Sequence, residues 1–149
     1  MMLDETLWPI AVFSLGATTT DDDWRRMFAH YDDFYTRHQF FFAVTDGLGV
    51  RNLPTSGQRK LIAEMARDHE PRSRRWCVGG ASVLPNTVAR GVMTAITWLA
   101  PPVYALTYHE TLDQALAEAV RTLQAKGIVV PEVALRSARG PASGRGAAR

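Results

Sequence analysis

The sequence predicts a single α/β domain with a four- to five-stranded, mostly parallel sheet and alternating helices. Three observations lead to this fold class. Short apolar runs alternate with segments of helical periodicity, each helical segment begins and ends at recognisable signals, and the chain of 149 residues with 46% hydrophobic residues is long enough to bury a core. Right-handed crossovers between the strands would place them largely parallel, with helices packed on the sheet.

Four segments have the composition of buried strands: 7–15, 39–45, 76–83 and 103–108. The run 39–45 (QFFFAVT) is continuously apolar, which suits the middle of a sheet. The pair Gly79–Gly80 in the third run would allow another part of the backbone to approach closely.

Two helices are predicted in the first half of the chain. Thr20 is expected to cap the first, which runs to about Arg37 and has Asp21, Asp22 and Asp23 in its first turn. The second is expected over 56–69, with Pro71 just beyond its end. The residues predicted to face the core are Trp24, Met27, Phe28, Tyr31 and Tyr35 in the first helix and Leu61, Ile62 and Met65 in the second.

Two more helices are predicted in the second half. One opens at Pro85-Asn86 and stops at Pro101 and Pro102, and the other opens with a capping box of Thr111 and Gln114 and stops at Gly127. The predicted inward residues are Val88, Val92, Ala95, Ile96 and Leu99 in the former and Leu112, Ala115, Leu116, Ala119, Val120 and Leu123 in the latter. The segment 128–135 is expected to add a short piece against the core.

Residues 1–135 are therefore predicted to form the domain, and residues 136–149 a disordered tail rich in Arg, Gly and Ala. The tail holds four arginines and no acid, so removing its charge from the net +2 leaves −2 for residues 1–135. This balance argues against nucleic-acid binding by the domain.

The absence of a long apolar run argues against a membrane span, and the start of the chain lacks the pattern of a signal peptide. With Cys77 as the single cysteine, we expect a cytoplasmic protein without disulfides.

No group of residues has the spacing of an active site. The four histidines are scattered without a metal-binding motif, and Cys77 lies in a strand of buried type, where a thiol is usually inert. The three consecutive aspartates are explained by the helix dipole. We therefore expect a protein that is not an enzyme and that binds neither a metal nor a cofactor.

Two stretches resemble the STAS/SpoIIAA-like family of bacterial regulatory domains. In 44–57 (VTDGLGVRNLPTSG), a strand ends in Asp and is followed by a Gly-Val step, a hydrophobic residue, Thr-Ser and Gly at a helix start. The second stretch, 79–117, contains Arg90-Gly91, the run WLAPP and a closing T-L-x-x-A-L helix, which is most similar to the uncharacterised SpoIIAA-like branch. The resemblance covers about 120 of the 149 residues. It implies signalling by protein–protein interaction, with Ser56 or neighbouring Thr55 as phosphoacceptor; helix capping alone would also account for both hydroxyls.

Two further features suggest where a protein partner would bind. Arg72, Arg74 and Arg75 form a basic cluster, interpreted either as a solvated loop or as a docking patch for an acidic partner. Trp98 with Pro101 and Pro102 is interpreted either as core packing or as a rigid apolar contact surface. The first hypothesis is thus a non-enzymatic regulatory domain with an unidentified protein partner, and homodimerisation stays open. The alternative is a binding or carrier domain for a lipid or other apolar small molecule, because aromatic residues are plentiful in 24–42.

Overall fold

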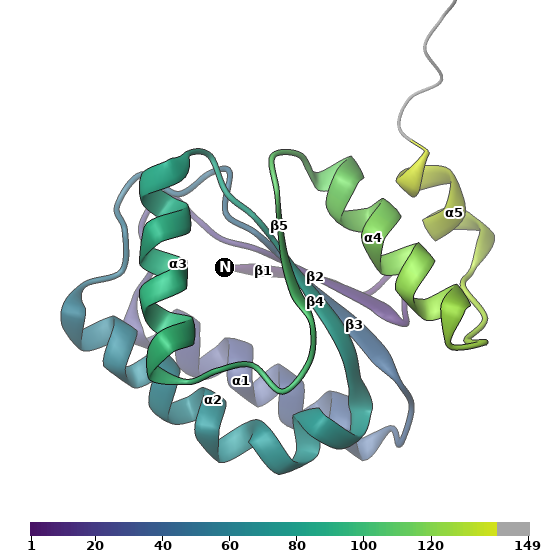
Figure 1. Cartoon of the computed structure of the whole chain (residues 1–149), viewed down its shortest axis with the longest axis horizontal. Coiled ribbons are helices and arrows are strands. Elements are labelled where there is room, and N and C mark those ends of the chain that lie inside the picture. Colours follow the sequence, from purple (N-terminus) through teal and green to yellow (C-terminus); the bar gives the residue numbers. More distant parts are fainter. Residues whose placement is uncertain (140–149) are drawn as a thin grey trace, which may run out of the picture.

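The computed structural model describes residues 1–139 and contains one five-stranded sheet with strands in the order of the sequence (Figure 1). The edge strand β1 is antiparallel to β2, and β2 through β5 run parallel to one another. The elements are β1 (Met2–Asp4), β2 (Ile10–Ser14), α1 (Asp21–Thr36), β3 (Phe41–Asp46), α2 (Ser56–Trp76), β4 (Cys77–Val83), α3 (Thr87–Leu99), β5 (Leu106–His109), α4 (Leu112–Ala125) and α5 (Glu132–Ala138).

The prediction of an α/β fold with alternating helices is confirmed, and the sheet is mixed because of β1. This strand was not predicted, since its three residues are too few and too exposed to form a periodic pattern. The predicted strands 7–15 and 103–108 both began too early. Strand β2 starts at Ile10 and β5 at Leu106, because the residues before them form turns and loops that carry apolar side chains into the core.

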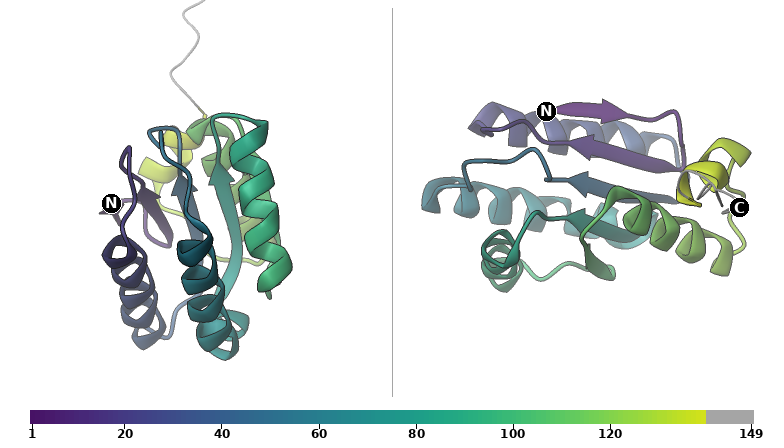
Figure 2. Two further views of the ribbon diagram at one scale, coloured as in Figure 1. Left: turned by 90° about the vertical axis from the view of Figure 1, so that its left-hand side faces the viewer. Right: turned by 90° about the horizontal axis from the view of Figure 1, so that it is seen from above.

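Helices α1, α2 and α3 cover one face of the sheet, and α4 and α5 cover the other (Figures 1 and 2). Each face has its own core cluster, because successive strand residues point to opposite sides. In β2, for example, Ile10 and Val12 pack toward α4, whereas Ala11 and Phe13 pack toward α1.

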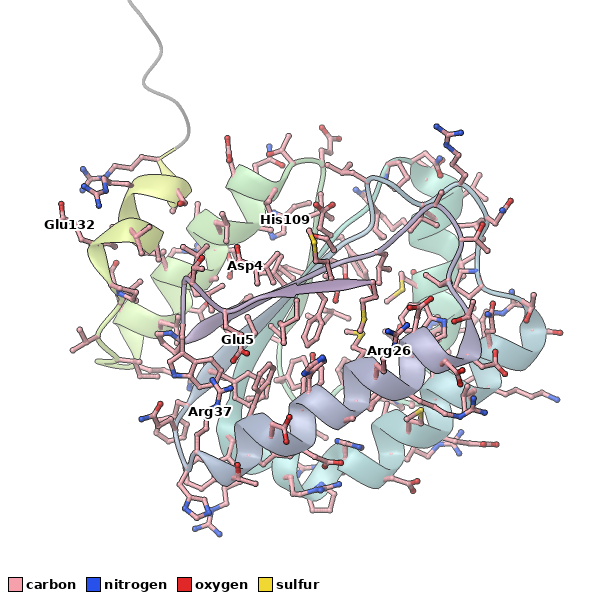
Figure 3. All side chains as sticks on the ribbon, turned by 180° about the vertical axis from the view of Figure 1, so that it is seen from behind. Asp4, Glu5, Arg26, Arg37, His109 and Glu132 are labelled. Carbon is pink, nitrogen blue, oxygen red and sulfur yellow. The ribbon has the colours of Figure 1, made fainter. Side chains whose placement is uncertain are left out.

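Aromatic rings fill the space between α1 and the sheet. The Phe13 and Tyr31 rings are stacked with centroids 5.6 Å apart, and Phe34 meets Phe41 edge-on at 5.3 Å. At the end of α1, the Arg37 guanidinium lies 4.2 Å from the centroid of the Trp8 ring and its Nη2 is 2.5 Å from Glu5 Oε1. Figure 3 shows Arg37 and Glu5 at this end of the helix. These rings fix α1 tightly against β2 and β3.

Side-chain caps start the helices where the sequence predicted. The Thr20 hydroxyl accepts a hydrogen bond from Asp23 N (3.2 Å), and the Asp23 carboxylate accepts one from Thr20 N (2.9 Å). The Thr111 hydroxyl accepts from Gln114 N (3.3 Å), but the Gln114 side chain accepts from Glu110 N, so the predicted reciprocal box is only half formed. Gly127, with φ at +71°, follows α4 as expected.

Helix α2 is seven residues longer than predicted, because Pro71 does not end it. The helix runs to Trp76 with Pro71 inside, although a proline there removes one backbone hydrogen bond. Tertiary contacts beyond the proline stabilise the last turns. The Ser73 hydroxyl is 2.7 Å from the Tyr35 hydroxyl, and Arg72 Nη1 is 2.5 Å from Asp32 Oδ1.

The predicted inward stripe of α3 was partly wrong. The structure buries Ala89 and Ile96, whereas Val88 is 65% exposed and Leu99 is 46% exposed. The residues that face the sheet are Ala89, Val92, Met93 and Ile96, so the prediction was correct for Val92 and Ile96 and missed Ala89 and Met93. Almost every side chain of α3 is apolar or small, so periodicity alone did not select the correct face.

The segment after α4 packs against the core, as predicted for 128–135, with Val130 and Ala134 buried. Helix α5 continues through Arg136 to Ala138, so the predicted boundary of the disordered tail is wrong for these residues. The remainder of the predicted tail, 140–149, lies outside the described residues.

We predict that Cys77 of the native protein reacts slowly with a thiol reagent. The side chain is buried on the α1 face of β4, and burial raises the pKa of its thiol to about 12, so the reactive thiolate is scarce. Labelling should become rapid when denaturant is added, which serves as the control. Fast labelling without denaturant would contradict the burial of this strand.

Candidate functional site

An apolar pocket of about 300 Å³ lies between the sheet and the layer formed by α1, α2 and α3. Figure 2 (left) shows these three helices side by side. All three helices contribute side chains to the wall of the pocket. These are Trp24, Met27, Phe28 and Tyr31 from α1; Ile62, Ala66, Arg67, His69, Glu70 and Ser73 from α2; and Ala89, Val92, Met93, Ile96 and Thr97 from α3. Strand and loop residues complete it, among them Leu15, Thr45, Leu53, Ser82, Tyr104 and Leu106.

The pocket exists because small residues from β3 and β4 lie beneath α3. Strand β2 presents Phe13 to α1, but the positions paired with it in the next two strands are Thr45 and Ser82. Ala11 of β2 is likewise paired with Ala43, which is paired with Gly80. A Cβ atom on Gly80 would lie 2.9 Å from Tyr104 Cε2, so the glycine allows the tyrosine ring to lie against the strand. A Cβ atom on Gly79 would likewise lie 2.6 Å from Phe42 Cε2. Each glycine of the pair therefore makes room for an aromatic ring.

Helix α3 covers the pocket and is tied to α2 at its end. Arg67 donates hydrogen bonds from Nε (3.3 Å) and Nη2 (3.1 Å) to the carbonyl oxygen of Leu99. At the other end, the Asn86 side chain caps α3 by accepting from Ala89 N (2.9 Å). The C-terminal end of α3 is thus tied to α2, while its middle spans the pocket.

His69 is a buried polar residue in the pocket wall. Its side chain packs between the Phe28 ring (centroids 5.0 Å apart) and the Tyr35 ring (5.8 Å), and the residue is 7% exposed. The nearest carboxylate oxygen, Asp32 Oδ1, lies 3.7 Å from Nδ1, which is beyond hydrogen-bond distance. Burial lowers the pKa of His69 below 6.5, partly offset by Asp32, so the ring is neutral at pH 7.

Trp24 is the second wall residue with a buried, unpartnered polar atom. Among the residues that the structure describes, neither Trp24 Nε1 nor His69 Nδ1 has a hydrogen-bond partner. Leaving a buried donor unpaired costs about 1–3 kcal/mol, so such atoms are uncommon in folded proteins. Both residues line the pocket, so its apolar wall carries two polar side chains whose hydrogen-bonding groups are not all used within the protein.

Tyr31 and Tyr104 add hydroxyl groups to the pocket wall. Burial raises the pKa of both tyrosines well above the ordinary value of 10.0, and each also affects the pKa of the other because they are neighbours. Both phenols are therefore neutral hydrogen-bonding groups. The polar part of the wall consists largely of such uncharged groups.

The phosphoacceptor residues expected at the start of α2 are exposed. Thr55 is the N-cap: its hydroxyl accepts from Gln58 N (3.2 Å) while Thr55 N donates to Gln58 Oε1 (3.0 Å). Ser56 is the first helical residue, and the cap interaction that was also considered for it belongs to Thr55. Phosphorylation of either residue stays a prediction.

The basic cluster lies on a helix, so its interpretation as a loop was wrong. Arg72 pairs with Asp32, Arg74 Nη2 is 2.8 Å from Glu70 Oε1, and the Arg75 guanidinium lies 5.0 Å from the Trp76 ring centroid. All three cations already contact groups of the same chain. A docking role for them would have to break or share these contacts.

Trp98 does not pack in the core, because its side chain is 83% exposed at the end of α3. Pro101 and Pro102 are also exposed, yet both contribute to the rim of the pocket. The structure thus places Trp98 on the outside of the helix that covers the pocket. The sequence interpretation missed the pocket, since its wall comes from segments as far apart as Leu15 and Leu106 that share no motif.

Within residues 1–139, no group of three or more His, Cys, Asp or Glu side chains is arranged to hold a metal ion. No helix in that range is long and apolar enough to cross a membrane.

No protein-family model, curated protein or solved structure matches this chain. The STAS-like assignment therefore stays a prediction.

Proposed function

We propose that the protein is a binding domain for an apolar small molecule, held in the pocket beneath α3. The observation that carries this proposal is an apolar pocket whose wall includes the polar side chains of Trp24 and His69. Ligand sites in proteins have this character: mostly apolar, with a few polar groups that orient the ligand.

The volume limits the size of the ligand. A cavity of roughly 150 Å³ holds a benzene molecule, so the 300 Å³ pocket fits a compound of about two fused rings or an acyl chain of similar volume. A whole membrane lipid exceeds this volume. A compact aromatic or short acyl compound is therefore the favoured class.

We predict that naphthalene, used as a probe, binds the wild-type protein and that Val92→Trp abolishes its binding. Val92 lies on the pocket side of α3, so an indole there would occupy the cavity. The matched control is Val88→Trp, the same substitution on the exposed side of α3, which should bind like wild type. Binding is measured by chemical-shift changes in ¹H–¹⁵N spectra, and circular dichroism checks that both variants fold.

Two outcomes would contradict the proposal. Wild-type spectra that do not change up to the solubility limit of naphthalene would mean that the pocket accepts no apolar compound. Equal binding by Val92→Trp would place the probe elsewhere.

We propose a second function, protein–protein recognition through the end of α3, on one specific observation. Trp98 and Leu99 expose apolar surface next to Pro101 and Pro102, and exposed aromatic residues of this kind are typical of binding hot spots. The regulatory role implied by the STAS resemblance would act through this surface.

For this second function we predict that Trp98→Ala weakens self-association or partner binding at least tenfold while leaving thermal stability nearly unchanged. Val129→Ala, at another exposed apolar residue, is the control. Sedimentation velocity detects a homodimer, and affinity purification from the native cells followed by titration of the purified partner detects another protein. If Trp98→Ala and Val129→Ala bind the partner equally well, the surface around Trp98 is not the binding site.

A further inference from the structure

The polar residue His69 indicates which chemical group the ligand carries, an inference that rests on the proposed function of the pocket. The Nδ1 side of the imidazole is directed toward Asp32, whose carboxylate is ion-paired with Arg72 at 2.5 Å. A carboxylate 3.7 Å away favours the tautomer with its proton on Nδ1. The other ring nitrogen, Nε2, is then an acceptor on the side of the ring away from Asp32.

The ring that carries this acceptor lines the pocket. Since a neutral Nε2 without a proton can only accept a hydrogen bond, its partner on a ligand must be a donor such as a hydroxyl group. A ligand that has only an acceptor, for example an ether, would leave Nε2 unsatisfied.

The charges near His69 argue against an ionised ligand. Glu70 is paired with Arg74 at 2.8 Å, and the Arg67 guanidinium donates twice to the Leu99 carbonyl. The remaining polar wall groups, including Tyr31, Tyr104 and Ser82, are uncharged. A carboxylate beside His69 would lose hydration, and the guanidinium of the wall residue Arg67 already donates from Nε and Nη2 to the Leu99 carbonyl.

We propose that the pocket selects an uncharged, apolar compound of about two fused rings that donates a hydroxyl hydrogen bond to Nε2 of His69. Phenols and alcohols belong to this class. Asp32 is a positioning residue in this arrangement, because it acts on the ligand only through the imidazole.

Four probes with one skeleton test the proposal at pH 7.5: naphthalene, 2-naphthol, 2-methoxynaphthalene and 2-naphthoate. We expect 2-naphthol to bind wild-type protein at least tenfold more tightly than each of the other three. In His69→Phe, which keeps a ring of similar shape, this advantage should vanish while naphthalene binds as before. Asp32→Asn should reduce the advantage several-fold, and Asp33→Asn, the same change at the next position of α1, should leave it intact.

The outcomes separate the two proposals. If naphthalene binds but 2-naphthol binds no better, or if the advantage persists in His69→Phe, the assignment of His69 is wrong and the pocket remains a binding site. Equal binding of 2-methoxynaphthalene would overturn the donor requirement, and tighter binding of 2-naphthoate would overturn the uncharged class. If none of the four binds, the proposed function itself fails.

Discussion

The packing of α1 against α2 is the interaction on which the pocket depends. The Tyr35 and Ser73 hydroxyls, the ion pair of Asp32 with Arg72, and the Phe28–His69 ring contact join the two helices along their second halves. These contacts hold α2 in helical form past Pro71 and place His69 in the pocket wall. Because Arg67 of the same helix bonds the end of α3, the position of α3 also depends on α2.

The pocket also requires a contrast in side-chain size across the face of the sheet that α1, α2 and α3 cover. Under α1, large rings such as Phe13 and Phe41 fill the space up to the helix. Under α3, the short side chains of Thr45 and Ser82 leave space that the residues of α3 do not fill, and the remaining volume is the pocket. A pocket of 300 Å³ is larger than the gaps that ordinary side-chain packing leaves, which supports a binding role for it.

Local signals predicted much of this fold but not the site. The caps at Thr20 and Thr111, the stop at Gly127 and the apolar runs of β3 and β4 each act within a few residues, so they are visible in the sequence. The course of α2 through Pro71 depends on Asp32 and Tyr35, which are about 40 positions away, and no local pattern reports such contacts. The pocket likewise results from the sizes of residues on separate strands, which become neighbours only in the folded sheet.

A crystal of the protein equilibrated with xenon gas would test most directly whether an apolar pocket lies beneath α3, because xenon enters preformed apolar cavities without a specific hydrogen bond. We predict a strong xenon peak between α3 and the sheet, within contact of Val92 and Ile96 above and Ser82 below. An electron-density map with α3 packed directly onto Thr45 and Ser82, and without xenon at this place, would contradict the existence of the pocket.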